Sequence, residues 1–507
     1  MYLLGIDIGT SGTKTVLFDT KGKQVASALE EYGMAQPKAG WAEQNPEDWW
    51  HAVANTIKQV IDASGIEPDQ IKGIGLSGQM HGLVLLDEHN QVIRPSIIWC
   101  DQRTQKQCDD MTAIVGRDKL IEITGNPAIT GFTASKILWV KDNEPKNYER
   151  VHHILLPKDY IRLKLTGVYA TEVSDASGMQ LLDIEKRDWS DELLELLGID
   201  RNLLAKVYES VEVTGGVTAD VSQLTGLAKG TPVVGGAGDQ AAGAIGNGII
   251  AKGHVSATIG TSGVVFAHTD KPLKDPKGRI QTFCHALPGA WHVMGVTQGA
   301  GLSLRWYRDN FCTNEQHVAE DMGCDPYELM TKEAAQAEVG SKGLMYLPYL
   351  MGERTPHLDP YAKGVFFGIA PSHTKRDMIR AIMEGVTYSL RDCLTLIHDL
   401  GIETNTVRVS GGGSKSALWR QMQADIYDRP VTTIHASEGP ALGVAILAGV
   451  GTGVFSSVEE ACEQLIDYGE GIQPNTANHQ RYMQFYTLYA KLYAQLKDTF
   501  KAHQALL

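Results

Sequence analysis

The pentapeptide Ile-Gly-Thr-Ser-Gly occurs twice in the chain, at 8–12 and at 259–263, each time directly after an apolar run. A bound triphosphate needs amides and hydroxyls around its oxygens, and a turn of Gly, Thr and Ser between two strands offers both. A single copy fits an ordinary β-hairpin turn equally well. Two copies about 250 residues apart favour a pair of phosphate-binding turns.

Two carboxylates stand beside glycine-rich segments. Asp7 directly precedes the first turn, where it is placed to hold Mg²⁺ beside the phosphates, although it could also simply cap the turn. Asp239 is the only ionisable residue between Lys229 and Lys252 and separates a short strand from a helix of small residues. It is a candidate general base that takes a proton from a hydroxyl as a phosphoryl group arrives, and a helix-capping role is the alternative.

Two polar segments, 77–82 and 99–103, each follow an apolar stretch. Buried polar side chains at strand ends suit a polyol, whose hydroxyls need hydrogen-bonding partners. The alternative for His81 is a satisfied core histidine, and for Met80 it is plain core packing. The candidate polyol contacts are Met80, His81, Trp99 and Asp101.

Glycines in the second half suggest a place for a flat ring. The segments 410–415 and 438–443 could form a slot for adenine and ribose, or could be structural strand-to-helix turns. The stretch 236–241 formally fits a dinucleotide fingerprint, but Asp239 would stand where the pyrophosphate lies. The sequence contains no GxxxxGK[ST] loop, no GxSxG elbow and no HExxH motif, which disfavours P-loop, serine-hydrolase and zincin chemistry.

Composition limits the remaining classes. The 507 residues are 43% hydrophobic and 21% charged, enough for two globular domains. A net charge of −14 without a basic block argues against binding to nucleic acid or an anionic membrane. Seven dispersed cysteines without a CxxC pair, and the lack of a leader or a long apolar segment, predict a reduced, cytoplasmic protein.

Periodicity predicts a mixed α/β fold. Strands are expected at 2–7, 13–19 and 24–31 as an antiparallel meander, with 71–76 and 82–87 as further strands of the same sheet. Helices are expected at 46–63, 375–400, 415–426 and 479–504, and a strand at 406–410. The repeated turn predicts two related domains, residues 1–248 and 249–507, facing each other across a cleft.

Taken together with two further segments, these motifs show that the chain resembles the FGGY family of carbohydrate kinases. Residues 131–141, GFTASKILWVK, are similar to the first family signature, and residues 364–384 are similar to the second. The likeness extends from Asp7 to about Gly453. It implies the two-domain, actin-like ATPase (ribonuclease H-like) architecture, with duplicated domains around a central cleft, and it implies ATP and Mg²⁺.

The resemblance also implies residue roles. Asp239 is the expected catalytic base and Asp7 the magnesium-linked aspartate, so both count as catalytic. Met80 and His81 become expected sugar contacts, and Gln240 joins Asp239, Trp99 and Asp101 in that group. The expected nucleotide contacts are Thr10, Ser11, Lys14, Gly260, Thr261, Gly412 and Gly413.

The acceptor follows from finer similarities. The segments 79–82, 99–103, 156–160 and 352–357 are most similar to those of family members that phosphorylate D-xylulose at O5, and Cys100 stands where many relatives have Asn. Ribulose, L-xylulose, gluconate and glycerol are the alternative acceptors, and a non-catalytic sugar-binding regulator or an ATPase chaperone could share the architecture. The family resemblance also suggests a homodimer.

Overall fold

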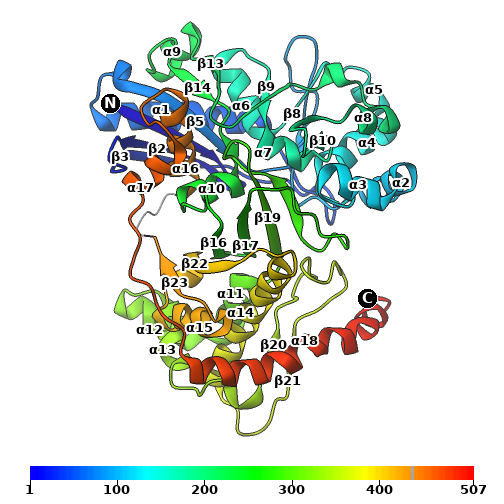
Figure 1. Cartoon of the computed structure of the whole chain (residues 1–507), viewed down its shortest axis with the longest axis vertical. Coiled ribbons are helices and arrows are strands. Elements are labelled where there is room, and N and C mark those ends of the chain that lie inside the picture. The colour runs from blue at the N-terminus through cyan, green and yellow to red at the C-terminus, as the bar shows by residue number, and fades with distance from the viewer. Residues whose placement is uncertain (435–438, 507) are drawn as a thin grey trace.

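The computed structural model describes residues 1–434 and 439–506, which form two lobes (Figure 1). The first lobe is built on a sheet of strand order β13-β14-β5-β1-β2-β3, with β15 added beside β5. The second lobe is built on a six-stranded sheet of order β18-β19-β17-β16-β22-β23. The predicted α/β class is confirmed.

The first sheet begins with the predicted meander. Strands β1 (Tyr2–Ile8), β2 (Gly12–Asp19) and β3 (Gln24–Glu31) pair antiparallel in sequence. Strand β5 (Ile71–Gly78) belongs to the same sheet, as predicted, and lies parallel to β1 on its other side, while β14 (Pro232–Val234) lies parallel to β5. The sheet is completed by β13 (Val213–Gly216) and β15 (Ala237–Gly238). Three parallel strands therefore end at one edge.

The expectation that 82–87 continues this sheet is wrong. Strand β6 (Val84–Leu86) instead pairs with β8 (His153–Leu155) in a separate two-stranded sheet. The cause lies just before it, because His81 has a positive φ of 67° and turns the chain away from β5. A side chain at Gly82 would meet Pro157, so the redirected chain packs closely on the first residue of helix α6 (Pro157–Thr166).

The second sheet repeats the plan of the first. Strand β16 (Gly253–Ile259) pairs antiparallel with β17 (Gly263–Thr269), as β1 does with β2, and parallel with β22 (Thr404–Gly411), as β1 does with β5. The predicted duplication is thus confirmed in strand order and direction. The other strands of this sheet are β18 (Gln281–Cys284), β19 (Trp291–Thr297) and β23 (Val431–Thr433).

The long helices follow their sequence signals. Helix α1 (Pro46–Ser64) starts after Asn45, whose side chain accepts from Glu47 N, and α14 (Lys375–Asp399) starts with a capping box of Thr374 and Asp377. Helix α15 (Ala417–Tyr427) begins two residues later than predicted because 412–414 form a 3₁₀ turn, and α18 is Thr476–Gln504. The smaller helices include α2 (Gln105–Val115), α3 (Arg117–Thr124), α4 (Thr133–Asn143), α6 (Pro157–Thr166), α7 (Val173–Ala176), α8 (Asp191–Leu197), α9 (Ala219–Thr225), α10 (Asp239–Gly246), α11 (Ala300–Phe311), α12 (Thr313–Met322) and α13 (Pro326–Ala334).

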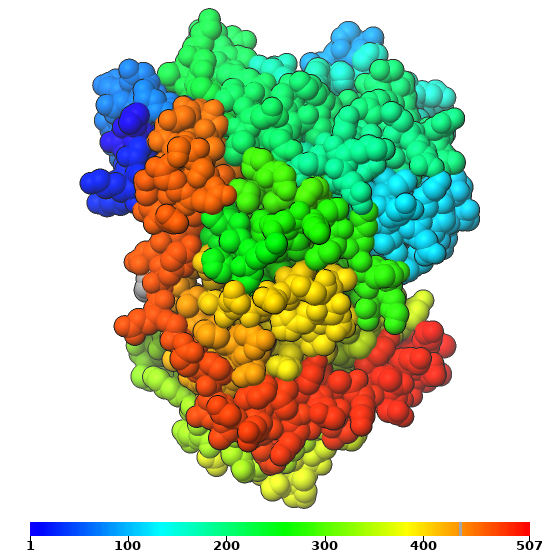
Figure 2. Space-filling view, in the orientation of Figure 1, coloured from blue at the N-terminus to red at the C-terminus, as the bar shows by residue number. Residues whose placement is uncertain are grey.

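One segment of the second half crosses back to the first lobe. Helices α16 (Gly439–Gly451) and α17 (Val458–Leu465) lie beside β1, β2 and β5, and Figure 2 shows this orange segment packed against the blue N-terminal strands. The predicted boundary near Gly248 falls between α10 and β16. The division into 1–248 and 249–507 stays a prediction, and the packing assigns 439–465 to the first lobe.

Helix α16 lies almost on the backbone of the strands beneath it. A Cβ at Gly5 would come within 2.0 Å of Ala441 O, and one at Gly75 within 2.0 Å of Val444 O. On its other side, a Cβ at Gly443 would come within 1.9 Å of Ala242 O in α10. Glycine is therefore required at these three crossings. In the described ranges, no helix combines the length and apolar character needed to cross a bilayer.

Candidate active site

The two candidate carboxylates come together at one edge of the first sheet. In the strand register, Asp7 of β1 and Ala237 of β15 lie on either side of Ser77 in β5. One step further, Ile8 and Gly238 flank Gly78, and Asp239 follows as the first residue of α10. Neighbouring strands lie about 4.8 Å apart, so β1 and β15 are two strand spacings apart, and Asp239 follows two residues beyond Ala237, which is level with Asp7.

The electrostatics of this edge suit a base. Burial raises the pKa of Asp239 to about 7, and the negative charge of Asp7 acts in the same direction, while hydrogen bonds from Gln240 oppose it. Asp7 itself accepts a hydrogen bond from Ser77 Oγ at 2.7 Å. Lys14 is opposite Asp7 in the β1–β2 ladder, so both side chains project from the same face of the sheet. A carboxylate with a pKa near neutrality can both take and release a proton.

The first turn, residues 9–12, is held by side chains that sequence reasoning missed. Tyr32 donates to Gly9 O at 2.6 Å, and Gln44 Nε2 donates to Thr10 O at 2.7 Å. Gln79 Nε2 in turn donates to Gln44 Oε1 at 2.8 Å. Gln44 sits in the two-residue strand β4 (Glu43–Gln44), far from the turn in sequence, so no local pattern could identify it. Thr10 and Ser11 lie in the turn where they were predicted.

Trp99 contacts this turn as well. Its Nε1 donates to Thr10 Oγ1 at 2.9 Å while the side chain keeps 38% of its surface exposed. The prediction placed Trp99 with the sugar contacts, and the structure places it between that region and the phosphate turn. A substrate that touches Trp99 would therefore also lie next to Thr10.

His81 is fixed by four contacts. Its Nδ1 lies 2.8 Å from Gly178 O, its carbonyl accepts from Lys136 Nζ at 2.7 Å and from Thr133 Oγ1 at 3.1 Å, and its ring stacks on Phe132 at 4.2 Å. Burial lowers its pKa to about 3, so the ring is neutral at physiological pH. Because a carbonyl only accepts, Nδ1 carries the proton and Nε2 remains an acceptor that suits a hydroxyl donor.

Met80 and Lys136 support the same corner. A Cβ at Gly238 would come within 2.8 Å of Met80 Cγ, so Met80 packs directly against the residue that precedes Asp239. Lys136 is fully buried, and burial lowers its pKa to about 7 against the opposing charge of Asp101. Lys136 belongs to the first family signature, but no role was predicted for it.

The Asp101 carboxylate is hydrogen-bonded to other groups of the protein. Its side chain is fully buried, its Oδ2 accepts from Ala42 N at 2.6 Å, and Arg103 binds both of its oxygens. This arrangement anchors the loop that carries Trp99. Direct contact between Asp101 and a sugar therefore remains a prediction without geometric support.

The predicted nucleotide contacts of the second lobe line one cavity of about 600 Å³. The second turn follows β16, and the glycines follow β22, which is paired with β16 through Ile259 and Gly411. A Cβ at Gly413 would come within 2.7 Å of Ile259 Cβ, so glycine is needed for the close approach. The cavity lining includes Gly260, Thr261, Gly412, Gly413, Tyr327, Lys332 and Trp419.

The second glycine segment lies at a close packing contact of α16. Of 438–443, Glu438 lies outside the described residues, and Gly439–Gly443 pack against α10 and β1. Within the described ranges they are not part of the cavity lining. Their small size serves helix packing, and the adenine-slot interpretation of this segment stays a prediction.

The second lobe reaches the sugar-side corner through its hairpin β18–β19. Phe283 of β18 lies 6.0 Å from Phe132 and 6.2 Å from His81 between ring centroids. Asn126 Nδ2 donates to Thr282 O at 2.9 Å, which ties the hairpin to the first lobe. The positive charge of Arg354 also helps to lower the pKa of His81, after burial and alongside Lys136. Arg354 lies in a segment quoted only for its resemblance, so its proximity is new.

This architecture, two related lobes with matching glycine-rich turns and a carboxylate pair at one sheet edge, defines a two-domain phosphotransferase fold of the actin-like ATPase type. Models of the FGGY family of carbohydrate kinases match this chain with their N-terminal domain at residues 2–246 and their C-terminal domain at 255–452. The chain therefore belongs to the FGGY family of carbohydrate kinases.

Similar proteins agree with this membership. A xylulose kinase of Bacillus subtilis (strain 168) is 40% identical over 98% of this chain and 97% of its own length. The crystal structure of a xylulose kinase from Brucella ovis superposes with a TM-score of 0.89 at 34% identity, covering 98% of this chain and 100% of that one. The ligand-bound xylulose kinase from Lactobacillus acidophilus gives a TM-score of 0.92 at 28% identity, with 99% of each chain covered.

Proposed function

We propose that this enzyme transfers the γ-phosphoryl group of ATP to O5 of D-xylulose, giving D-xylulose 5-phosphate and ADP. The observation that carries the proposal is the position of Asp239, a carboxylate with a pKa raised to about 7, at the sheet edge where the strands that lead to His81 and to the first glycine-rich turn also end. The relatives named xylulose kinase supply the substrate. His81 and Trp99 supply polar groups for a ketopentose, and Met80 supplies an apolar contact.

The chemical step uses the chain's own carboxylate. The ketopentose lies in the first lobe, and ATP extends from the second-lobe cavity toward the first turn. Asp239, in its ionised form, accepts the O5 proton as O5 forms a bond to Pγ and the bond from Pγ to the β,γ-bridging oxygen breaks, releasing ADP. The turn containing Thr10 and Ser11 binds the transferred phosphoryl oxygens with its amides and hydroxyls.

The residues present fit a bound Mg²⁺. Carboxylate oxygens are the ligands that Mg²⁺ prefers, and Mg²⁺ commonly uses one or two of them together with water and phosphate oxygens. Asp7 fits this requirement, because it ends a strand beside the phosphate turn and its charge already raises the pKa of Asp239. When bound, the ion would neutralise charge on the β- and γ-phosphates. Asp7 would hold it, directly or through water.

His81 selects for a hydroxylated substrate. A neutral imidazole that donates from Nδ1 to Gly178 presents Nε2 as an acceptor, which pairs with a sugar hydroxyl rather than with a carboxylate. The neutral ring thus suits a hydroxyl group of D-xylulose, the proposed acceptor. Closure of the lobes would exclude water, which otherwise competes with O5.

The direct experiment is ADP release with Mg²⁺-ATP and a panel of D-xylulose, L-xylulose, D-ribulose, L-ribulose, gluconate and glycerol. We expect kcat/KM to be highest for D-xylulose. Preference for another polyol would keep the kinase and refute the assignment of His81, Trp99 and Met80 to D-xylulose. No stimulation by any member would favour the regulator instead.

Two further properties belong with this proposal. The enzyme is expected to act in the cytoplasm, where its seven cysteines, all free thiols in the structure, would stay reduced. A homodimer is expected from the family resemblance. Light scattering on the purified protein measures the molar mass and distinguishes a dimer from the 55.3 kDa monomer.

A further inference from the structure

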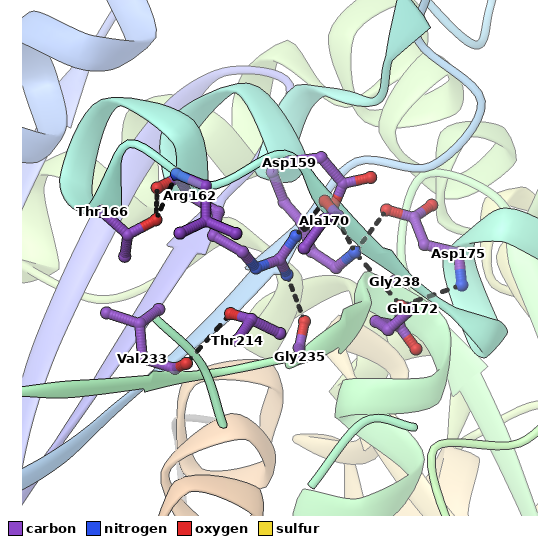
Figure 3. Close-up of polar contacts among 12 residues, drawn as sticks. Asp159, Arg162, Thr166, Ala170, Glu172, Asp175, Thr214, Val233, Gly235 and Gly238 are labelled. Atoms are coloured by element: carbon purple, nitrogen blue, oxygen red, sulfur yellow. Dashed lines mark hydrogen bonds and ion pairs between the residues drawn. The ribbon is translucent and has the colours of Figure 1, made fainter. Parts of the chain in front are cut away.

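Five ionisable side chains form a buried cluster behind the sheet edge that carries Asp239. We call Lys158, Asp159, Arg162, Glu172 and Asp175 the buried charge cluster, and each is at most 1% exposed. Lys158 Nζ lies 3.1 Å from an oxygen of each of the three carboxylates. Figure 3 shows Arg162 at the centre of this region, reaching toward Gly235, with Glu172 and Asp175 near Gly238.

The charges of the cluster balance only when one carboxyl group is protonated. Two cations face three acids, and a buried net charge is costly. Burial favours the neutral form of Asp159, but Lys158 and Arg162 outweigh it and lower the pKa of Asp159. Burial raises the pKa of Asp175 to about 8, reinforced by its acidic neighbours and opposed by Lys158. Asp175 therefore holds the proton at neutral pH, and the other four groups cancel.

The contacts of Glu172 suit an ionised carboxylate. Glu172 accepts from Ser174 N at 2.8 Å, Ser174 Oγ at 2.9 Å, Asp175 N at 3.0 Å and Ser210 Oγ at 2.8 Å. All of these partners donate, which suits an ionised carboxylate. Within the described parts of the chain, neither Asp175 oxygen has a hydrogen-bond partner, and its close contact is Lys158.

The cluster connects directly to the backbone beside Asp239. Gly238 N donates to Ser174 Oγ at 3.1 Å, and the same Ser174 hydroxyl donates to Glu172. Arg162 donates to Gly235 O, at the other end of the segment that leads to Asp239. Lys158 also packs against the end of β5, since a Cβ at Gly78 would come within 2.9 Å of its Cβ. One end of residues 235–238 is thus attached directly to Arg162, and the other is attached through the Ser174 hydroxyl to Glu172.

We infer that the buried charge cluster is the positioning device for Asp239, acting from ionised Glu172 through Ser174 to the Gly238 amide. Glu172 orients the Ser174 hydroxyl so that its lone pair faces Gly238 N, and this fixes the first turn of α10 with Asp239 at its start. Asp175 contributes as a neutral group. The inference rests on the proposed role of Asp239 as the base.

The test compares two isosteric changes in one cluster, Glu172→Gln and Asp175→Asn. Glu172→Gln replaces an acceptor with an amide that cannot accept from all of its donors, so kcat is expected to fall at least about tenfold, with both KM values within about twofold. Asp175→Asn preserves the neutral state, so its kcat and KM values should stay within about twofold of wild type. Equal effects of the two changes would overturn the inference.

A readout that a purely structural role would not move is the pH dependence of kcat/KM. If Asp239 is loosened, its carboxylate gains solvent, and the acid limb of the profile should shift to lower pH in Glu172→Gln. A lower Tm with unchanged kcat and an unchanged pH profile would make the cluster a stability element only, which contradicts the inference.

Ser174→Ala keeps the proposal testable should Glu172→Gln fail to fold. It leaves all five ionisable side chains of the cluster in place and removes only the link to Gly238, so we expect kcat to fall about threefold to tenfold with both KM values unchanged. Wild-type kcat and pH profile in Ser174→Ala would refute the link.

Asp239→Asn, measured in parallel, separates this inference from the proposed function. Near-normal turnover in that variant would remove Asp239 as the base. Loss of turnover in Asp239→Asn, together with wild-type kcat and pH profiles in Glu172→Gln and Ser174→Ala, would reject the positioning inference alone.

Discussion

The two turns that share one pentapeptide are equal in geometry and unequal in charge. In the first lobe, Asp7 and Ser77 are register partners on β1 and β5, joined by a 2.7 Å hydrogen bond. In the second lobe the equivalent partners on β16 and β22 are Thr258 and Ser410, whose hydroxyls lie 2.8 Å apart. The duplication preserved the bond between the strands and replaced a carboxylate with a hydroxyl.

The other partner strand differs in the same way. Lys14 stands opposite Asp7, whereas the uncharged Val264 stands opposite Thr258. Next to the first turn lies Asp239, and next to the second lies a cavity of about 600 Å³. In the proposed mechanism, ionisable groups are therefore concentrated at the first turn, where a proton moves. The second turn has uncharged register partners, and the cavity beside it provides space for the nucleotide.

The largest effect should come from removing the charge that distinguishes the turns. Asp7→Asn keeps the acceptor for Ser77 but removes the negative charge, so kcat with Mg²⁺-ATP is expected to fall about 10²-fold or more. Thr258→Val, the matched change in the second lobe, should alter kcat by less than about threefold. Steady-state kinetics on both variants measure the difference, and similar losses would show that the turns are equivalent.

The pH profile sharpens the comparison. Asp239 must be ionised to accept a proton, and its pKa is raised to about 7, so kcat/KM should rise with pH up to about 7 and fall roughly tenfold per pH unit below it. Because the charge of Asp7 contributes to this raised pKa, Asp7→Asn should shift the acid limb to lower pH, while Thr258→Val should leave it in place. An acid limb below pH 5 in the wild type would exclude Asp239 as the titrating base.

A smaller effect is expected from filling space beside the nucleotide cavity of the second lobe. A Cβ at Gly413 would lie 2.7 Å from Ile259 Cβ, whereas one at Gly412 would lie 3.8 Å from Ile259 O, an ordinary contact. Gly413→Ala should raise the KM for ATP about tenfold with little change in the KM for sugar, and Gly412→Ala should change neither by more than about twofold. Titration with ATP at saturating sugar provides the measurement, and equal effects would contradict the cavity assignment.

The smallest effect concerns the residues that hold His81 in the first lobe. Lys136→Met removes the charged donor to His81 O and leaves that buried carbonyl with Thr133 alone, so the KM for sugar should rise about fivefold at unchanged KM for ATP. Thr133→Val, which removes the longer of the two hydrogen bonds, should have a weaker effect. A selective change in the KM for ATP would place Lys136 in a different role.

Much of the first turn and of the carboxylates beside it could be predicted because their sequence signals are local. Asp7, the pentapeptide and the strand after it are contiguous, and Asp239 stands out as a single carboxylate among small residues. The same holds for α14, whose capping box is written in four consecutive residues. Local hydrogen bonding and periodicity fix such elements before tertiary packing does.

What could not be predicted depends on distant partners. Gln44 reaches the first turn from another strand, and the Asp101 carboxylate accepts from Ala42 N, which lies far from it in the sequence. The close crossing of 439–443 with α10 and β1 depends on elements that lie far from this segment in the sequence. The redirection at His81 likewise depends on Gly178 and Lys136.

The return of 439–465 to the first lobe also affects how the protein can be made. Leu3, Val16 and Phe18 share a core with Leu442 and Val444, so one face of the N-terminal sheet is covered by residues from near the other end of the chain. During synthesis, which proceeds from the N-terminus, that face stays open to water until the ribosome has translated most of the message. A nascent chain of this design has an exposed apolar surface to protect for as long as its second lobe takes to emerge.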